Sequence, residues 1–289
     1  GVFEVDGQGI KASYSGVSRI LFDGGNGNDR LEVVGLGAQA DDPANPGVDV
    51  RIYAFGGAGT DVLWGGSADD VLEGGTDDDI LDGRSGQDAL DGQDDDDQLT
   101  GGPDDDIVFG GDGTDLIQGN GGADFLYGGP GDDTIYGANR PDEERELGAD
   151  LGDYIEGNPG DDLLWGGDGD DEAHGGSGQD RLYGEKGQDE LFGDSGHDRL
   201  DGGPGDDPLL YGGEGNDLVI GDDGFDRLFG GWGNDVILAH RLEIGQIVGA
   251  IEKKGLGHGA GRVARRCAIS GRWPAERDGQ FAGGHLRDT

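Results

Sequence analysis

The sequence lacks several features that would indicate disulfides, a membrane span or a signal peptide. Its 289 residues include one cysteine, Cys267, so no disulfide can form within the chain. No stretch approaches the ~18 consecutive apolar residues of a transmembrane helix. Residues 1–18 lack the basic region and apolar core of a signal peptide. Because the chain has no methionine, we expect it to be a fragment or a processed product, from which a leader could have been removed.

Positive charge is also scarce. The chain has 20 Lys and Arg against 63 Asp and Glu, for a formal net charge of −43. Such a chain repels itself and stays expanded unless cations neutralise it. The charge argues against nucleic acid as a partner and favours a divalent cation. We expect a monomer without a membrane span.

Glycine is abundant and follows a nine-residue period. There are 67 glycines, far above the usual share of about 7%, and they show no collagen period. Residues 56–136 read as nine consecutive nonapeptides: GGAGTDVLW, GGSADDVLE, GGTDDDILD, GRSGQDALD, GQDDDDQLT, GGPDDDIVF, GGDGTDLIQ, GNGGADFLY and GGPGDDTIY. Position 1 is always Gly, position 6 is always Asp, and position 8 is always a branched aliphatic residue.

The same pattern occurs on both sides of this block. One copy lies at residues 24–32 (GGNGNDRLE), and ten more lie within residues 148–238, with Tyr211 read as one inserted residue. All twenty copies have Asp at position 6, and all but one have Leu, Ile or Val at position 8, the exception being Ala173. A disordered Gly/Asp-rich tract would not keep this register, so the pattern predicts a folded solenoid.

The nonapeptide resembles the RTX (haemolysin-type) calcium-binding repeat, GGxGxDxUx, whose fold is a parallel β-roll. The resemblance implies an all-β parallel β-roll (a β-helix or solenoid) with an irregular N-terminal cap and a partly disordered C-terminal tail. We divide the chain into an N-terminal β cap with one isolated repeat (1–55), a first roll block (56–136), an insertion loop (137–147), a second roll block (148–238), and a C-terminal cap helix with a basic tail (239–289).

The chemistry of the repeat agrees with calcium binding. Glycines permit a tight turn with inward carbonyls, and positions 7–9 form a short strand that points position 8 to one face. Two copies, 18 residues, make one turn, so Asp61 stacks over Asp79 on one edge and Asp70 over Asp88 on the other. Stacked carboxylates repel unless a hard cation lies between them, and Ca²⁺ takes six or more oxygen ligands in a flexible cage. Binding would then be coupled to folding.

The resemblance implies that calcium ions lie between turns, held by loop carbonyls and by the position-6 aspartates. These are Asp29, Asp61, Asp70, Asp79, Asp88, Asp97, Asp106, Asp115, Asp124, Asp133, Asp153, Asp162, Asp171, Asp180, Asp189, Asp198, Asp207, Asp217, Asp226 and Asp235. Asp29 has no partner copy 18 residues away. Asp153 follows the insertion and has Leu151 at position 4, where a left-handed backbone suits Gly or Asp but not Leu. We therefore expect incomplete sites at these two.

Other interpretations are weaker. A merely solvated acidic surface does not explain the fixed register, and a nine-residue period excludes EF-hands. With no HExxH or GxSxG motif, we expect no enzyme activity in these residues. Aromatic residues recur at position 9, where cross-strand stacking is favoured over a glycan-binding strip: Trp64, Phe109, Tyr127, Tyr136, Trp165, Tyr183, Phe192 and Phe229. The basic run at residues 262–273 (RVARRCAISGRW) either contacts the acidic roll or, as is usual for charge runs, is solvated.

The sequence therefore predicts calcium binding by a calcium-folded module of a secreted, extracellular protein that leaves the cell by a type I-like route. Two alternatives stay open. The chain could be the non-catalytic tail of a secreted protease, lipase, epimerase or pore-forming toxin, or it could be a calcium-stiffened adhesin or spacer with a glycan or cell-surface partner.

Overall fold

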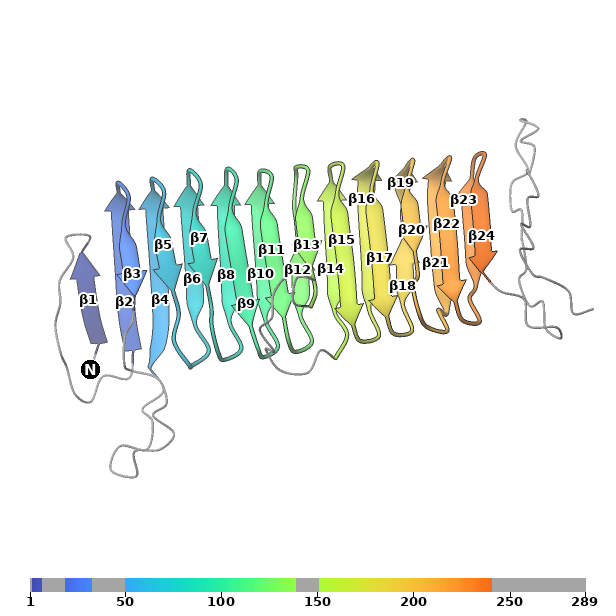
Figure 1. Cartoon of the computed structure of the whole chain (residues 1–289). Helices are drawn as coiled ribbons and strands as arrows, with labels where there is room; N and C mark the ends of the chain where they lie inside the picture. Colours follow the sequence, from blue (N-terminus) through green and yellow to red (C-terminus); the bar gives the residue numbers. More distant parts are fainter. Residues whose placement is uncertain (1, 7–18, 33–49, 139–150, 241–289) are drawn as a thin grey trace, which may run out of the picture.

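The computed structural model describes residues 2–6, 19–32, 50–138 and 151–240, and in these ranges the chain is a flattened solenoid of parallel strands with no helix (Figure 1). From β2 onward, successive strands alternate between two sheets, except that β18 and β19 belong to the same sheet. The 13-stranded sheet, called sheet A, contains β1 (Val2–Asp6), β2 (Arg19–Asn26), β4 (Arg51–Ala58), β6 (Val71–Thr76), β8 (Ala89–Asp94), β10 (Ile107–Asp112), β12 (Phe125–Tyr127), β14 (Tyr154–Pro159), β16 (Glu172–Gly178), β18 (Glu190–Phe192), β19 (Ser195–Gly196), β21 (Leu209–Gly215) and β23 (Leu228–Trp232).

The 11-stranded sheet, called sheet B, lies against it. It contains β3 (Arg30–Glu32), β5 (Val62–Trp64), β7 (Ile80–Asp82), β9 (Gln98–Gly102), β11 (Leu116–Asn120), β13 (Thr134–Tyr136), β15 (Leu163–Asp168), β17 (Arg181–Lys186), β20 (Arg199–Asp201), β22 (Leu218–Asp223) and β24 (Val236–His240). The predicted all-β parallel roll is confirmed. Within the described ranges, no helix is long and apolar enough to cross a membrane.

The register between neighbouring turns follows the repeat. Leu72 of β6 pairs with Leu90 of β8, 18 residues on, as two nonapeptides per turn require. The pairing skips residues where the chain is interrupted. Leu31 of β3 pairs with Leu63 of β5 across residues 33–49, so the solenoid continues in register through the interruption.

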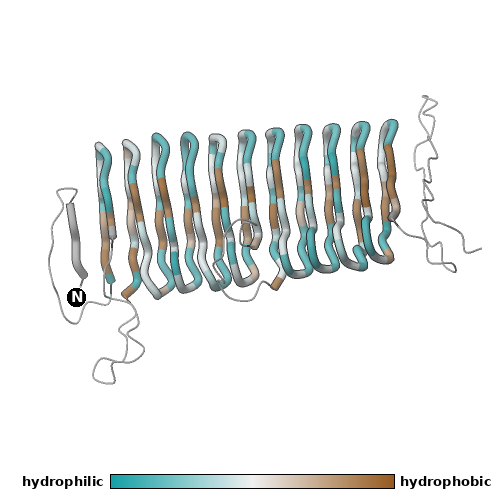
Figure 2. Tube along the Cα trace, viewed as in Figure 1, coloured by the Kyte–Doolittle hydropathy of each residue, from teal (hydrophilic) through white to brown (hydrophobic). Residues whose placement is uncertain are grey.

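The core is a double row of position-8 side chains between the two sheets. The fully buried members include Leu63, Leu72, Leu81, Leu90, Leu99, Ile117, Leu126, Ile135, Ile155, Leu164 and Leu182. Ala173, the one small residue among the twenty nonapeptides at this position, is buried as well. Figure 2 shows the hydrophobic segments on the strands and the hydrophilic ones at the turns. One aliphatic residue per nonapeptide makes a thin core, so the turns must contribute to stability.

Part of the N-terminal segment adds strands to the roll. β1, β2 and β4 are successive strands of sheet A, and Ile20, Phe22 and Ile52 are buried in the same core. The remainder of the expected cap, residues 7–18 and 33–49, lies outside the described residues, as does the expected C-terminal helix and tail beyond His240.

The second interruption falls inside a turn. Asn120 N donates to Gly137 O at 2.7 Å, and Ala138 N donates to Gly166 O at 3.0 Å. In the regular copies, the N–H of position 2 donates to the carbonyl of position 1 in the next turn. Gly137 therefore begins the copy that ends in Asp153 and β14. Gly148, taken from the sequence as its first residue, lies outside the described residues.

The interpretation of Tyr211 as an inserted residue is wrong. Leu210 is fully buried and pairs with Leu191 of β18, so Leu210 rather than Leu209 occupies position 8. The extra residue is Pro208, which precedes β21. At position 7 the backbone N–H donates to the Asp of the preceding turn, as Arg199 N does to Asp180 O at 2.9 Å. Proline has no N–H to donate, so the structure places it outside the ladder.

Candidate metal centres

The position-6 aspartates form two ladders, one along each edge of the roll. Edge 1, where the chain passes from sheet A to sheet B, carries Asp29, Asp61, Asp79, Asp97, Asp115, Asp133, Asp162, Asp180, Asp198, Asp217 and Asp235. Edge 2, where it returns to sheet A, carries Asp70, Asp88, Asp106, Asp124, Asp153, Asp171, Asp189, Asp207 and Asp226. All are buried except the half-buried Asp29, Asp226 and Asp235, which lie in the end turns.

From Asp61 onward, one oxygen of each ladder carboxylate accepts a hydrogen bond from the preceding turn. Asp79 Oδ1 accepts a hydrogen bond from Asp61 N at 2.7 Å, and Asp97 Oδ1 accepts one from Asp79 N at 2.7 Å. On edge 2, Asp106 Oδ1 accepts from Asp88 N at 2.8 Å. The predicted stacking of Asp61 on Asp79 and of Asp70 on Asp88 is confirmed. This use of Oδ1 was not predicted from the sequence.

The two aspartates expected to stand apart belong to the ladders. Asp29 N donates to Asp61 Oδ1 at 2.6 Å, although 32 residues separate them. Asp124 N donates to Asp153 Oδ1 at 2.8 Å across the second interruption. Gly152, beside Leu151, takes a left-handed backbone with φ +106°. The expectation that Asp29 lacks a stacking partner is wrong, because stacking follows position in the roll rather than distance along the chain.

The second carboxylate oxygen is buried and, within the described part of the chain, has no hydrogen-bond donor. This holds for Oδ2 of Asp29, Asp61, Asp79, Asp88, Asp97, Asp106, Asp115, Asp133, Asp162, Asp171, Asp180, Asp189, Asp198, Asp207 and Asp217. Burying a charge without a partner costs free energy. This cost favours the protonated carboxyl and so raises its pKa. Burial raises the pKa of Asp79 to about 6, of Asp97 to about 8 and of Asp88 to about 9.

The Oδ2 atoms lie beside the position-1 glycines, in the space that a Cβ would occupy. A Cβ added to Gly83 would lie 2.5 Å from Asp88 Oδ2 and 2.8 Å from the carbonyl oxygen of Gly101 in the next turn. At Gly212 the corresponding distances, to Asp217 Oδ2 and Gly230 O, are 2.6 Å each. A carboxylate oxygen and a carbonyl oxygen from successive turns thus converge beside each such glycine, and any side chain there would fill the space between them.

This donor set fits calcium. Calcium takes six to eight oxygen ligands, including backbone carbonyls, at ~2.3–2.6 Å. In the described ranges no three His, Cys, Asp or Glu side chains converge as a metal site. The oxygens that do converge between turns are a carboxylate Oδ2 and a main-chain carbonyl. Bound calcium would neutralise the buried Oδ2 charges. The assignment of individual aspartates as ligands stays a prediction.

Asp70 differs from the others because both of its oxygens already accept hydrogen bonds. Ile52 N donates to Oδ1 at 2.6 Å and Gly66 N donates to Oδ2 at 2.7 Å. The preceding turn on edge 2 has Ile52 where later turns have Asp. The ladder on this edge therefore begins with a carboxylate that the backbone has partly satisfied.

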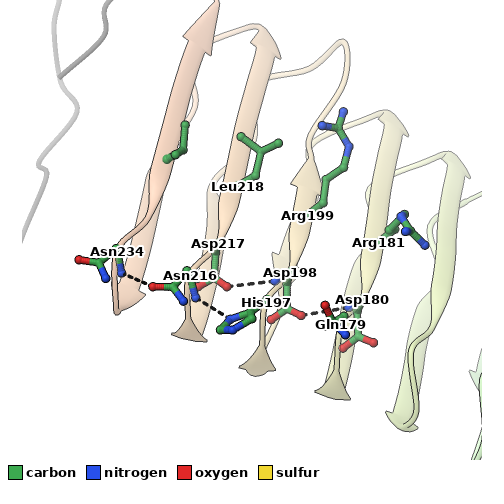
Figure 3. A pocket seen from close by; sticks show the side chains of 11 residues that line it. Gln179, Asp180, Arg181, His197, Asp198, Arg199, Asn216, Asp217, Leu218 and Asn234 are labelled. Atoms are coloured by element: carbon green, nitrogen blue, oxygen red, sulfur yellow. Dashed lines mark hydrogen bonds between the residues drawn. The ribbon is translucent and has the colours of Figure 1, made fainter. Parts of the chain in front are cut away.

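A second, outer ladder, which was not predicted from the sequence, runs along each edge at position 5. Asp161 Oδ1 accepts from Gln179 N at 2.7 Å, and Asn216 Oδ1 accepts from Asn234 N at 3.0 Å. His197 takes the same place, its Nδ1 accepting from Asn216 N at 2.9 Å in the groove drawn in Figure 3. The available signal was the frequent Asp or Asn at position 5.

Position-9 aromatic rings stack between turns as predicted. Phe109 and Tyr127 lie 4.9 Å apart between ring centroids, and Trp165 lies 4.5 Å from Tyr136 and 5.5 Å from Tyr183, all nearly parallel. Because both faces of Trp165 are covered by neighbouring rings, this geometry favours cross-strand stacking over sugar binding, which needs a free ring face.

Comparisons with known proteins agree with this geometry. A family model described as the RTX calcium-binding nonapeptide repeat matches residues 55–90, 83–117, 109–139, 147–182, 174–207 and 211–241. A search of curated proteins found no match. The matched ranges cover more than half of the chain and include the ladder aspartates from Asp61 to Asp235, and RTX repeats imply calcium binding in a β-roll. The chain belongs to the RTX calcium-binding nonapeptide repeat family.

Proposed function

We propose that this chain is a calcium-folded module of a secreted protein, unfolded at cytosolic calcium and assembled into a roll outside the cell. The observation that carries the proposal is that the Oδ2 atoms of the fifteen ladder aspartates named above are buried without a hydrogen-bond donor among the described residues. Like charges on successive turns oppose folding until a cation lies between them. Folding and calcium binding are therefore one equilibrium.

The low-calcium state matters for export. A chain with net charge −43 and one core aliphatic per nonapeptide has little to hold it compact without metal. An unfolded chain suits passage through a narrow type I-like channel, and extracellular calcium would fold it on exit. Calcium sites of extracellular modules have dissociation constants of about 10⁻⁴–10⁻³ M, which is the range this proposal requires.

The proposal includes the absence of catalysis in these residues. We propose that any protease, lipase, epimerase or toxin activity of a larger protein would come from other residues.

Limited proteolysis across free calcium concentrations tests the proposal. We expect rapid digestion at about 10⁻⁷ M calcium and protection of the roll at about 10⁻³ M, the extracellular range. Magnesium at the same concentration should not protect, because it demands a smaller octahedral site. Protection already complete at 10⁻⁷ M would contradict a module that is exported unfolded.

A further inference from the structure

The outer face of sheet A carries an exposed apolar patch in the middle of the roll. We define the outer aromatic patch as Ile107, Phe109, Phe125, Tyr127 and Tyr154, on the adjacent strands β10, β12 and β14. Ile107 and Phe109 are each 43% exposed and Phe125 is 50% exposed. The roll core does not need these side chains, which point away from it, and exposed apolar patches of this kind mark interaction sites.

Acidic side chains flank the patch on both sides. The next strand toward the N-terminus, β8, presents Asp91, which pairs with Phe109, and β6 beyond it presents Glu73. On the other side lie Glu156, paired with Tyr127, and Glu172, paired with Tyr154. An apolar surface between carboxylates suits a partner with both apolar and basic side chains.

The chain itself contains such a partner. Residues 262–273 (RVARRCAISGRW) hold four arginines and no acidic residue, with Val263, Ile269 and Trp273 among them. β24 ends at edge 2, where every earlier turn passes onto sheet A. From there, five strand spacings in sheet A separate β23 from β12, or ~24 Å at ~4.8 Å each. A flexible linker of 21 residues, the number between His240 and Arg262, would span a similar distance of ~25 Å.

We propose that the basic segment 262–273 binds the outer aromatic patch of its own roll, placing arginines against the flanking carboxylates and Ile269 and Trp273 against the rings. The patch exists only when three turns are assembled, because its residues come from β10, β12 and β14. The contact therefore forms with the folded roll and covers a surface that would otherwise be open to other proteins.

The only cysteine reports on this contact without further engineering, since Cys267 lies in the middle of the segment. The full chain is folded with calcium, checked by circular dichroism, and the rate of Cys267 alkylation by a maleimide is measured. We expect alkylation to be about tenfold slower than in the double variant Phe109→Ser/Phe125→Ser, because protection scales with the bound fraction. Arg262→Glu/Arg272→Glu, which leaves the residues next to Cys267 unchanged, should give the same fast rate.

Ile80→Ser is the matched control, because Ile80 is an exposed aliphatic of sheet B at 39% exposure. It should leave the slow rate unchanged. Equal rates in the unchanged chain and the patch variant would overturn the proposal. So would protection that depends on Trp232 at the end of the roll instead, or that falls on dilution and thus comes from a second copy. A chain that gains no strand signal with calcium would refute the proposed function instead.

Discussion

At the scale of single residues, the repeat is explained by what each position must leave room for. Aspartate is required at position 6 because Oδ1 accepts a hydrogen bond from the turn before while Oδ2 faces the glycine of its own turn. Glycine is required at position 1 because a Cβ there would meet that oxygen and a carbonyl of the next turn. The two most constant residues of the nonapeptide thus define one space between turns.

Removing one ladder carboxylate should reduce the number of calcium ions that the roll binds. Asp97 is bonded to Asp79 on one side and Asp115 on the other, so Asp97→Ala should weaken both adjoining sites and lower the calcium stoichiometry by at least one. Asp94→Ala is the control, since it removes the same charge from an exposed position of the same turn. Equilibrium dialysis measures the calcium stoichiometry of both variants. Unchanged stoichiometry in Asp97→Ala would mean that the stacking register is misassigned.

Neighbouring glycines should respond differently to a methyl group. Gly83→Ala puts Cβ against Asp88 Oδ2 and Gly101 O, whereas Cβ in Gly66→Ala would lie 3.7 Å from its nearest neighbours. We expect Gly83→Ala to destabilise the calcium-bound roll by about 1–3 kcal/mol and Gly66→Ala to have little effect. Calcium-dependent thermal unfolding measures both, and equal losses would argue against the space between turns as the metal site.

At the scale of elements, the strands are short and depend on one inward side chain each. In β15, Leu164 is fully buried while Leu163 beside it faces outward. Three-residue strands are too short to fix their own pairing register. The register is therefore set by the turns and by the buried side chain at position 8. The structure accordingly holds its register across both interruptions.

Substitutions in β15 separate the core from the outer face. Leu164→Ala should destabilise the roll by about 2–5 kcal/mol, as large-to-small core changes do, and Leu163→Ala by much less. Because folding and binding are coupled, Leu164→Ala should also move the calcium midpoint upward. A calcium titration followed by circular dichroism compares the two, and a larger shift for Leu163→Ala would contradict the inward assignment of position 8.

Most of the roll could be predicted from the sequence because the nonapeptide encodes turn, strand and core together. The misassignments arose where copies are not nine residues long. Counting from the preceding glycine put Leu209 in the core and made Tyr211 the extra residue, whereas the missing N–H of Pro208 places the extra residue there. Likewise Gly148 begins a contiguous nonapeptide in the sequence and Gly137 does not, although a turn tolerates an insertion that leaves its ends in place. The position-5 ladder depends on inter-turn bonds that no single copy contains.

At the scale of the whole molecule, buried like charge governs stability. The aspartate pKa values in the metal-free roll, about 6 to 9 for Asp79, Asp97 and Asp88, exceed the ordinary value of 3.8. Folding without metal therefore takes up protons. The metal-free roll is therefore most stable below pH ~4, where the aspartates of the unfolded chain are also protonated. Its stability falls as the pH rises through the raised pKa values of the buried aspartates.

Acid should thus partly replace calcium. In calcium-free buffer we expect more strand signal at pH 4 than at pH 8, whereas calcium affinity should fall as pH drops from 9 to 6 because protons compete for the same oxygens. Circular dichroism at fixed ionic strength tests both, with Asp94→Ala as a variant that should keep the profile. A metal-free spectrum independent of pH would show that the buried carboxylates do not oppose folding.

The most direct test of the central claim is far-UV circular dichroism of the full chain during a calcium titration, with magnesium as the control ion. The account predicts little strand signal in chelator at neutral pH and a cooperative gain with calcium alone. A spectrum already rich in strand in chelator would contradict it, because the position-8 core would then fold the roll without metal.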